Sequence, residues 1–285
     1  MTMSTLPAGT DLFPGTTEKQ WHELLVRSIR EPVISGIDMP RFPHGRVQRG
    51  FVGSADEQTL AEANNFWLHV KKACVKAGNP VTANTRFLDF GSAWGRYTRF
   101  FWRDIPAKNL FGVDIDPEIV ATCRYLGVPG HFSVIEPLGQ LPYADNSFDL
   151  IIAYSVFTHL PENVANHWMK ELSRVAAPGA VIAFTVEPRR FLTFIETLDP
   201  ASPNMWHALM ATFKDRVPGL LAQFDKGEYA YIPTSGGAYR DADVYGDAAI
   251  SERYIQERWS SLFRLVDYHD VEAEFWQAIV TAQKP

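Results

Sequence analysis

Hydrophobic residues in the middle of the chain form short runs that alternate with longer amphipathic stretches. Four such runs have the length and apolar content of buried strands, and they lie within 86–90, 109–115, 148–154 and 179–187. Helical periodicity marks the stretches between them, at 95–105, 117–127 and 162–176. Alternation of this kind predicts a parallel sheet with helices on both faces, because near-continuous apolar strands require cover on each side.

The segment before this alternating core has a different pattern. Residues 1–16 are rich in Thr, Pro and Gly and predict an extended arm, which a helix follows after Thr17. Residues 31–53 hold several prolines and glycines and predict a loop. Ser54, with Glu57 three residues later, has the capping-box pattern for a helix over 55–77. We therefore divide the first part of the chain into an N-terminal helical region, 1–84, and a core, 85–187.

After residue 187 the alternation stops, and the pattern predicts an inserted segment. Two helical stretches, 189–198 and 206–217, precede an irregular region rich in Gly, Tyr and Asp over 231–247. Such length and irregularity are typical of a substrate cap, which we assign to 188–250. A helix capped by Ser251 and two strands, within 262–270 and 274–283, predict that residues 251–285 complete the core.

Composition and charge narrow the classes of function. The chain has 285 residues and a net charge of −6, and this acidic balance opposes nucleic-acid binding, which needs a basic surface. Cys74 and Cys123 are far apart, and neither they nor the histidines show metal-ligand spacing, so we expect no metal. We find no signal-peptide pattern and no apolar run near the ~18 residues of a membrane span, which predicts a cytoplasmic protein without a membrane partner.

The turn that follows the first core strand is the most informative stretch. The strand ends at Asp89, and a helix is expected to begin near Gly95; between them lie Gly91, Ser92, Ala93 and Trp94. Small residues let the backbone approach a ligand, and N–H groups at a helix start bind carboxylate or phosphate. Asp114 ends the next strand, at the distance where doubly wound nucleotide-binding folds place an acid on the ribose hydroxyls. Together these features predict a nucleotide-type ligand.

Four segments resemble motifs of the class I S-adenosylmethionine-dependent methyltransferases, in the order of that family. LDFGSAWGR resembles the first motif, with Ala93 where a glycine often stands, and GVDIDPEIV resembles the second-strand motif. LPYADNSFDLIIAYSVFTHLPE resembles the segment around the fourth strand, and ELSRVAAPGAVIAFT resembles the helix, turn and fifth strand. FVGSADEQTLAEANNFW and the Ser-Val-Phe-Thr-His-Leu run are similar to the bacterial type 11/12-like subgroup, often found beside glycan or secondary-metabolite genes. The resemblance implies a Rossmann-like, doubly wound α/β fold with a mostly parallel seven-stranded sheet.

The same resemblance implies S-adenosyl-L-methionine as the cofactor and S-adenosyl-L-homocysteine as the product. The implied cofactor-binding residues are Asp89, Gly91, Ser92, Ala93, Gly95, Arg96, Asp114, Ile115, Leu138 and Tyr154. Asp114 is expected to bind the ribose, whereas Asp89 either serves the methionine end of the cofactor or forms a strand-end turn. Arg96 pairs either with the cofactor carboxylate or with Asp89 or another acid.

The adenine contact and Tyr154 carry alternatives, and Asp116 has an expected structural role. Many family members place an acid near the adenine amino group; here either Glu136 takes that role, displaced by one residue, or Leu138 covers the adenine face. Tyr154 either lines the pocket or packs in the core with its hydroxyl bonded. Asp116 is expected to cap the helix that starts at Pro117.

His159 is the candidate catalytic residue. It follows the fourth strand, at the edge where an open α/β sheet presents its ligand crevice, and its near-neutral pKa suits a general base for an oxygen nucleophile. The alternative is that His159 caps or packs the turn before Pro161. Tyr154-Ser155-Val156-Phe157 stands where methyltransferases of base amines carry Asn-Pro-Pro-Tyr, so we expect a small-molecule or glycan acceptor, methylated on oxygen.

Two other functions compete with this hypothesis. An NAD-dependent oxidoreductase normally carries Gly-x-Gly-x-x-Gly, and the spacing of Gly91 and Gly95 does not fit that pattern. A catalytically silent cofactor-binding scaffold or regulatory protein retains the same turn and Asp114, and production of S-adenosylhomocysteine distinguishes it from an enzyme. The pattern predicts neither the identity of the acceptor nor an oligomeric state.

Overall fold

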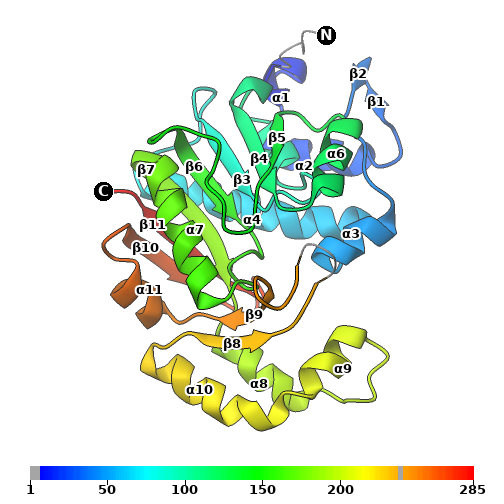
Figure 1. Cartoon of the computed structure of the whole chain (residues 1–285). Coiled ribbons are helices and arrows are strands. Elements are labelled where there is room, and N and C mark those ends of the chain that lie inside the picture. Colours follow the sequence, from blue (N-terminus) through cyan, green and yellow to red (C-terminus); the bar gives the residue numbers. More distant parts are fainter. Residues whose placement is uncertain (1–6, 237–239) are drawn as a thin grey trace. The chain divides into compact units, whose positions relative to one another are not determined.

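The computed structural model describes residues 7–236 and 240–285, which form two compact units (Figure 1). One unit comprises Met1–Ile152 with Val175–Val181, and the other comprises Ala153–Arg174 with Ile182–Pro285. These boundaries differ from the division predicted at residues 84, 187 and 250. The core strand over 176–186 contributes to both units, since its residues up to Val181 belong to the first and those from Ile182 onward belong to the second.

Among the described residues, seven strands form one sheet in the order β10-β11-β7-β6-β3-β4-β5. Their bounds are β3 (Phe87–Phe90), β4 (Leu110–Asp114), β5 (His131–Val134), β6 (Phe148–Ala153), β7 (Ala176–Val186), β10 (Arg264–His269) and β11 (Ala278–Gln283). β3 pairs in parallel with both β4 and β6, β4 pairs in parallel with β5, and β10 pairs antiparallel with β11. The predicted mostly parallel, seven-stranded α/β sheet is confirmed.

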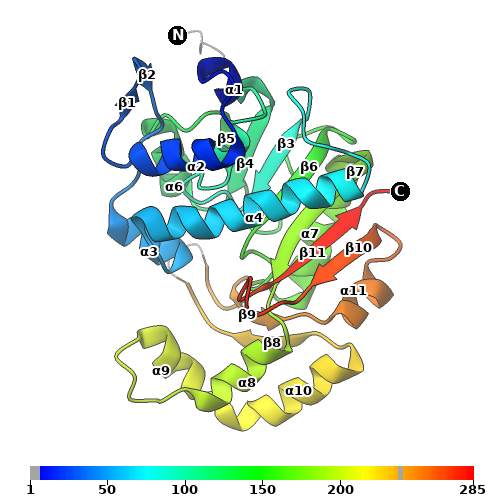
Figure 2. The same ribbon diagram turned by 180° about the vertical axis from the view of Figure 1, so that it is seen from behind.

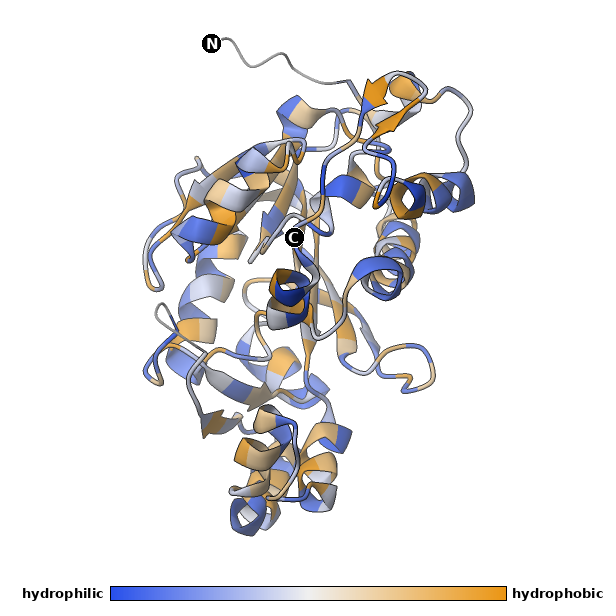
Figure 3. Cartoon of the chain, turned by 90° about the vertical axis from the view of Figure 1, so that its right-hand side faces the viewer, coloured by the Kyte–Doolittle hydropathy of each residue, from blue (hydrophilic) through white to orange (hydrophobic). Residues whose placement is uncertain are grey.

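Three of the four core strands fall within the predicted hydrophobic runs, and β7 begins three residues before its run; the buried side chains explain this agreement. All four residues of β3 are buried, and all but one of β4 and of β6. Figure 3 shows the strands mostly in the colours of hydrophobic residues, whereas polar and apolar positions alternate along the helices. No run predicted β5, because its first and last residues are exposed and only Phe132 is fully buried.

The first unit surrounds its strands with helices of very different length. They are α1 (Gly9–Leu12), α2 (Glu18–Arg27), α3 (Gly45–Val52), α4 (Asp56–Lys76), α5 (Thr98–Phe101), η1 (Ala107–Asn109) and α6 (Pro117–Tyr125). α2 and α4 lie along one face of β3 and β4 (Figure 2), and α6 packs beside β4 and β5. The Asp116 side chain accepts hydrogen bonds from the N–H groups of Glu118 and Ile119, so the predicted cap of α6 is confirmed.

The N-terminal predictions need three corrections. Residues 9–12 form a helix rather than part of an extended arm, because the N–H of Gly9 donates to the Trp102 carbonyl; residues 1–6 lie outside the described part. Residues 31–53 hold the two-stranded β1 (Val33–Ile34) and β2 (Ile37–Asp38) and then α3, rather than a loop. Ser54 does not cap α4: Ala55 occupies the N-cap without a side-chain bond, and Ser54 Oγ donates to Glu62 at 2.8 Å.

The second unit contains a layer of helices and strands with a hydrophobic core of its own. Its elements before β10 are α7 (Glu162–Val175), α8 (Arg189–Thr197), α9 (Met205–Ala211), η2 (Lys214–Arg216), α10 (Val217–Lys226), β8 (Ala230–Pro233), β9 (Gly246–Ala249) and α11 (Glu252–Arg258). Phe191, Ile195, Met210, Leu220 and Ile232 belong to one buried cluster that joins α8, α9, α10 and β8. The segment predicted as irregular therefore contains the antiparallel pair β8–β9; its residues 237–239 lie outside the described part.

Candidate functional site

The glycine-rich turn after β3 is folded by left-handed backbone conformations. Gly91, Ala93 and Gly95 have φ angles of +76°, +44° and +74°. The N–H groups of Gly91 and Ser92 both donate to the Val113 carbonyl at 2.9 Å, which ties the turn to β4. A glycine adopts such φ angles without strain, whereas Ala93 does so at a cost of about 1 kcal/mol. The prediction that a helix begins near Gly95 is wrong, because the Gly95 backbone is in the left-handed conformation. The helix α5 begins at Thr98.

Asp114 is positioned at the end of β4 by two backbone donors. Its Oδ2 accepts from the Ala93 N–H at 2.9 Å and its Oδ1 accepts from the Asp116 N–H at 3.1 Å. The residue is 9% exposed, so the carboxylate is held nearly rigid. A carboxylate oxygen accepts more than one hydrogen bond, so a carboxylate fixed in this way suits the paired hydroxyls of a ribose. Ile115, the next residue, is half-buried.

Ser92 and Gly95 give the turn its closely packed floor. Ser92 is 3% exposed, and its Oγ has no hydrogen-bond partner among the described residues. A Cβ at Gly95 would lie 2.7 Å from Val128 Cγ1, so a larger residue there would push the turn away from α6 and β5. A buried hydroxyl without a partner beside a tight turn fits a ligand that supplies the missing hydrogen bond.

Asp89 is an internal carboxyl group beneath the turn. It is 1% exposed, and its Oδ2 accepts from Thr98 Oγ1 at 2.8 Å, which joins the end of β3 to α5. Burial raises the pKa of Asp89 to about 7; the hydrogen bonds from Thr98 oppose this shift and the Asp114 carboxylate adds to it. A cationic group near Asp89, such as the ammonium of a methionine, would favour its ionised form.

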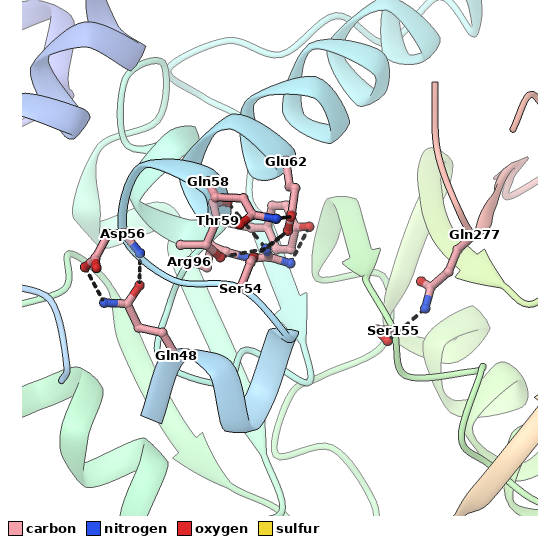
Figure 4. Close-up of polar contacts among 10 residues, drawn as sticks. Gln48, Ser54, Asp56, Gln58, Thr59, Glu62, Arg96, Ser155 and Gln277 are labelled. Atoms are coloured by element: carbon pink, nitrogen blue, oxygen red, sulfur yellow. Dashed lines mark hydrogen bonds and ion pairs between the residues drawn. The ribbon is translucent and has the colours of Figure 1, made fainter. Parts of the chain in front are cut away.

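Arg96 connects the turn to α4, as Figure 4 shows. Its Nη1 donates to Thr59 Oγ1 at 3.0 Å and lies 3.5 Å from Glu62 Oε2, and its Nη2 donates to Tyr97 Oη at 2.9 Å. Arg96 thus pairs with another acid, which was one of its predicted alternatives. Its contact with the cofactor carboxylate stays a prediction.

The N-terminus of α4 is fixed by a side-chain bracket. Asp56, at φ +56°, donates its N–H to Gln48 Oε1 at 2.9 Å, and Gln48 Nε2 lies 3.4 Å from Asp56 Oδ1 (Figure 4). The bracket joins α3 to α4 and replaces the capping box predicted from Ser54. α4 therefore brings Thr59 and Glu62 to Arg96 from a fixed starting point.

The adenine predictions concern the segment between β5 and β6. Leu138 is 50% exposed, so its apolar side chain is accessible to a flat ring. Glu136 accepts the Gly139 N–H through its backbone carbonyl at 3.0 Å, which closes a tight turn around Leu138. Both assignments stay predictions.

The second unit holds Tyr154 and His159, the other two predicted site residues. Tyr154 is half-buried directly after β6, and Ser155 follows with φ +55° and an N–H that donates to Thr185 Oγ1 at 2.7 Å. His159 Nδ1 lies 2.9 Å from the Gly246 carbonyl oxygen and 3.7 Å from Asp247 Oδ1. Its ring stacks on Tyr245, with centroids 4.7 Å apart and planes inclined by 14°.

These contacts fix the tautomer of His159. A carbonyl oxygen only accepts hydrogen bonds, so Nδ1 carries the proton and Nε2 carries the lone pair. Burial lowers the pKa of His159, although Asp247 and the Gly246 carbonyl oppose this shift. The side chain nevertheless keeps 26% of its surface exposed, so a neutral imidazole presents a free basic nitrogen.

Sequence reasoning missed three polar residues of this unit: Asp247 and Glu187, which are buried, and Gln277, which is partly buried. Asp247 is 4% exposed and accepts from Thr234 Oγ1 at 3.0 Å as well as facing His159. Gln277 Nε2 donates to Glu187 Oε1 and to Ser155 Oγ, each at 3.0 Å. The one available signal was position, since Glu187 ends the apolar run of β7 and Gln277 precedes that of β11.

Two classes of site are absent from the described residues. No group of three or more His, Cys, Asp or Glu side chains is arranged to hold a metal ion in residues 7–236 and 240–285. In the same ranges, we find no helix with the length and apolarity needed to span a membrane.

Comparisons with known proteins agree with this geometry. Residues 88–184 match the family described as "Methyltransferase domain". The PH0226 protein of Pyrococcus horikoshii OT3 is 15% identical, with a TM-score of 0.56 over 86% of this chain and 99% of that chain. An S-adenosylmethionine-dependent methyltransferase of Clostridium acetobutylicum ATCC 824 is 16% identical, with a TM-score of 0.52 over 78% and 91%.

A third similar structure is the magnesium protoporphyrin IX methyltransferase of Synechocystis PCC 6803, solved with bound S-adenosylhomocysteine. It is 13% identical, with a TM-score of 0.50 over 84% of this chain and 93% of that chain. At such identities the structures establish a common fold, and the match over 88–184 covers the glycine-rich turn, Asp114 and β3 to β7. The chain therefore contains a class I S-adenosylmethionine-dependent methyltransferase domain, with S-adenosylmethionine as its cofactor.

Proposed function

We propose that this enzyme methylates an oxygen atom of a small-molecule or glycan acceptor, with His159 as the general base. The fixed tautomer of His159 carries the proposal, because a neutral imidazole with a free Nε2 can take the proton of a hydroxyl. Asp247 is the group that stabilises the imidazolium that forms, at 3.7 Å from Nδ1. The buried free thiols Cys74 and Cys123 are compatible with the cytoplasm, which we propose as its location.

The chemistry divides between the cofactor and the protein. When bound, S-adenosylmethionine supplies a methyl carbon on positively charged sulfur, and methyl transfer leaves neutral S-adenosylhomocysteine. We propose that the glycine-rich turn and Asp114 hold the ribose part of the cofactor, and that Leu138 covers its adenine. The acceptor hydroxyl gains a bond to the methyl carbon and gives its proton to His159 Nε2.

His159→Asn tests this assignment. The asparagine amide can still donate to the Gly246 carbonyl, but it has no basic nitrogen, so we expect the turnover number to fall by about a hundredfold or more. The turnover number is measured as the rate of S-adenosylhomocysteine release with a panel of sugars and hydroxylated small molecules as acceptors. Amines of matched structure test whether oxygen is the preferred acceptor atom. His131→Asn, at an exposed position on β5, is the control.

Two results would contradict the proposal in different ways. Near-normal turnover of His159→Asn at saturating acceptor would remove the base role and leave His159 as part of the turn before Pro161. Cofactor binding without S-adenosylhomocysteine formation on any acceptor would favour the scaffold function instead.

A further inference from the structure

A second polar group of the same unit lies where three strands begin or end. Ser155 follows β6 by two residues, Glu187 follows β7 directly, and Gln277 immediately precedes β11. β11, β7 and β6 are neighbours in the sheet, so residues 90 and 122 positions apart in the chain are brought into contact. The hydrogen bond between Gln277 and Ser155 is visible in Figure 4. In open α/β sheets, ligands bind outside the carboxyl ends of the strands, and Ser155 and Glu187 follow two such ends.

The hydrogen bonds within this group leave two oxygens without a donor. Gln277 Nε2 serves both Ser155 Oγ and Glu187 Oε1 at 3.0 Å. Glu187 Oε2 and Gln277 Oε1 are buried and have no hydrogen-bond partner among the described residues. Glu187 as a whole is 7% exposed. Each such oxygen costs about 1–3 kcal/mol when left unpaired, so a pair of them on one bonded unit requires an explanation.

The electrostatic surroundings favour an uncharged partner. Burial raises the pKa of Glu187 to about 8, and nearby Asp247 adds to this shift, while Gln277 and Arg190 oppose it. Glu187 is therefore protonated at neutral pH and can both donate and accept a hydrogen bond. An ammonium ion would require the ionised carboxylate and is disfavoured, whereas a hydroxyl group matches a neutral acid beside an amide.

We propose that Glu187 and Gln277 form an acceptor-binding subsite for two adjacent hydroxyl groups of a carbohydrate-like polyol. One hydroxyl pairs with Glu187 Oε2 and its neighbour donates to Gln277 Oε1, so both buried oxygens are satisfied together. A single hydroxyl would leave one oxygen unpaired. This subsite rests on the proposed function, since it selects the acceptor that His159 would deprotonate.

The strand β9 connects this subsite to His159. The Glu187 carbonyl accepts the Ile250 N–H at 3.1 Å, just after β9, and Glu187 bridges with Ala249. At the other end of β9, the Gly246 N–H donates to the His159 carbonyl at 2.7 Å. The short strand β9 thus fixes the backbone of both Glu187 and His159. An acceptor that is bound by Glu187 and deprotonated by His159 requires such fixed positions.

Ligand-observed NMR of the full-length protein saturated with S-adenosylhomocysteine tests the subsite. The probes are methyl mannoside and vicinal cyclohexanediol, with cyclohexanol and cyclohexylamine as matched compounds that lack the diol. We expect both diols to bind the wild type, and to bind about tenfold more weakly or worse to Glu187→Leu and Gln277→Leu, because each variant removes one partner. Glu187→Gln retains a donor and an acceptor, so we expect it to restore binding.

Thr281→Val is the matched control. Thr281 lies on β11, the strand that begins directly after Gln277, but it is outside the subsite. Its side chain is fully buried, and its Oγ1 has no hydrogen-bond partner among the described residues. We expect this variant to bind the diols like the wild type, and all variants to bind S-adenosylhomocysteine equally. These equal affinities show that each protein is folded.

Three results would overturn the subsite: no diol binding by the wild type, equal diol binding by Glu187→Leu, or preferred binding of cyclohexylamine. Each is separate from failure of the proposed function. Failure of the proposed function would appear as no S-adenosylhomocysteine binding by the wild type, or as a turnover number of His159→Asn equal to that of the wild type.

Discussion

Asp114 and Glu187 are buried carboxyl groups at the ends of two strands, and the protein treats them in opposite ways. Backbone N–H groups of Ala93 and Asp116 bind both oxygens of Asp114. Glu187 receives one side-chain donor, from Gln277, and its second oxygen has no partner among the described residues. The first arrangement sets a carboxylate in place before any ligand arrives. The arrangement at Glu187 leaves one carboxyl oxygen able to form a further hydrogen bond, and the unpaired oxygen lowers the stability of the folded protein.

Among the tests of this comparison, we expect the largest effect from Glu187→Gln, which removes the ionisable group at position 187 and changes the pH dependence of stability. The folded protein keeps the Glu187 proton up to about pH 8, whereas an ordinary glutamate releases it near 4.5. Between these values the folded state binds more protons than the unfolded chain, so the free energy of unfolding falls as pH rises. Each pKa unit corresponds to about 1.4 kcal/mol, so the total reaches several kcal/mol.

Thermal unfolding of the wild type and Glu187→Gln from pH 5 to pH 9 measures this effect. The variant cannot ionise, so we expect the wild type to lose stability relative to it across that window, by about 2–4 °C for each kcal/mol. Asp89 titrates in both proteins, so its contribution cancels in the difference, whereas Asp247 interacts with Glu187 and the difference includes that interaction. Parallel curves would mean that Glu187 is already ionised when folded and that its second oxygen has a charged partner.

Asp114→Ala addresses the other side of the comparison. It removes the proposed ribose ligand and one of the bonds that hold Ala93, so we expect S-adenosylmethionine affinity to fall by about tenfold or more. Calorimetry measures the affinity directly. Asp116→Ala is the control, since it removes the neighbouring carboxylate and costs about 1 kcal/mol of stability through the lost cap of α6. Unchanged affinity in Asp114→Ala would refute the ribose assignment.

The contrast between the two carboxyl groups also explains what the sequence could predict. Asp114 and the glycine turn are local features, because a strand end and a turn are set by residues close together in the chain. Their positions, the parallel sheet and the cap of α6 by Asp116 all followed from such short-range patterns. Glu187 and Gln277 are 90 residues apart, and only strand order places them together. No pattern along the chain marks that contact.

The wrong local predictions have a similar cause. Ser54 and Glu57 have the sequence pattern of a capping box, but the Ser54 hydroxyl donates to Glu62 instead of capping the helix. The first residue of α4, Asp56, is bound by Gln48. Gly95 looks like the beginning of a helix, but its N–H donates to the Ser92 carbonyl and keeps the turn open until Thr98. In both places a tertiary or turn contact outweighs a propensity of about 1 kcal/mol.

Ala93→Gly gives the smallest expected effect and sharpens the comparison at Asp114. Ala93 holds φ +44° while its N–H binds the Asp114 carboxylate, so a charge-assisted bond offsets the strain of a left-handed alanine. Glycine removes that strain but makes the unfolded chain more flexible, so we expect a net gain of about 0.5–1 kcal/mol in unfolding free energy. Ala63→Gly, in the middle of α4, is the control and should lose about 1 kcal/mol. A loss of stability in Ala93→Gly as well would mean that the turn holds Ala93 without strain.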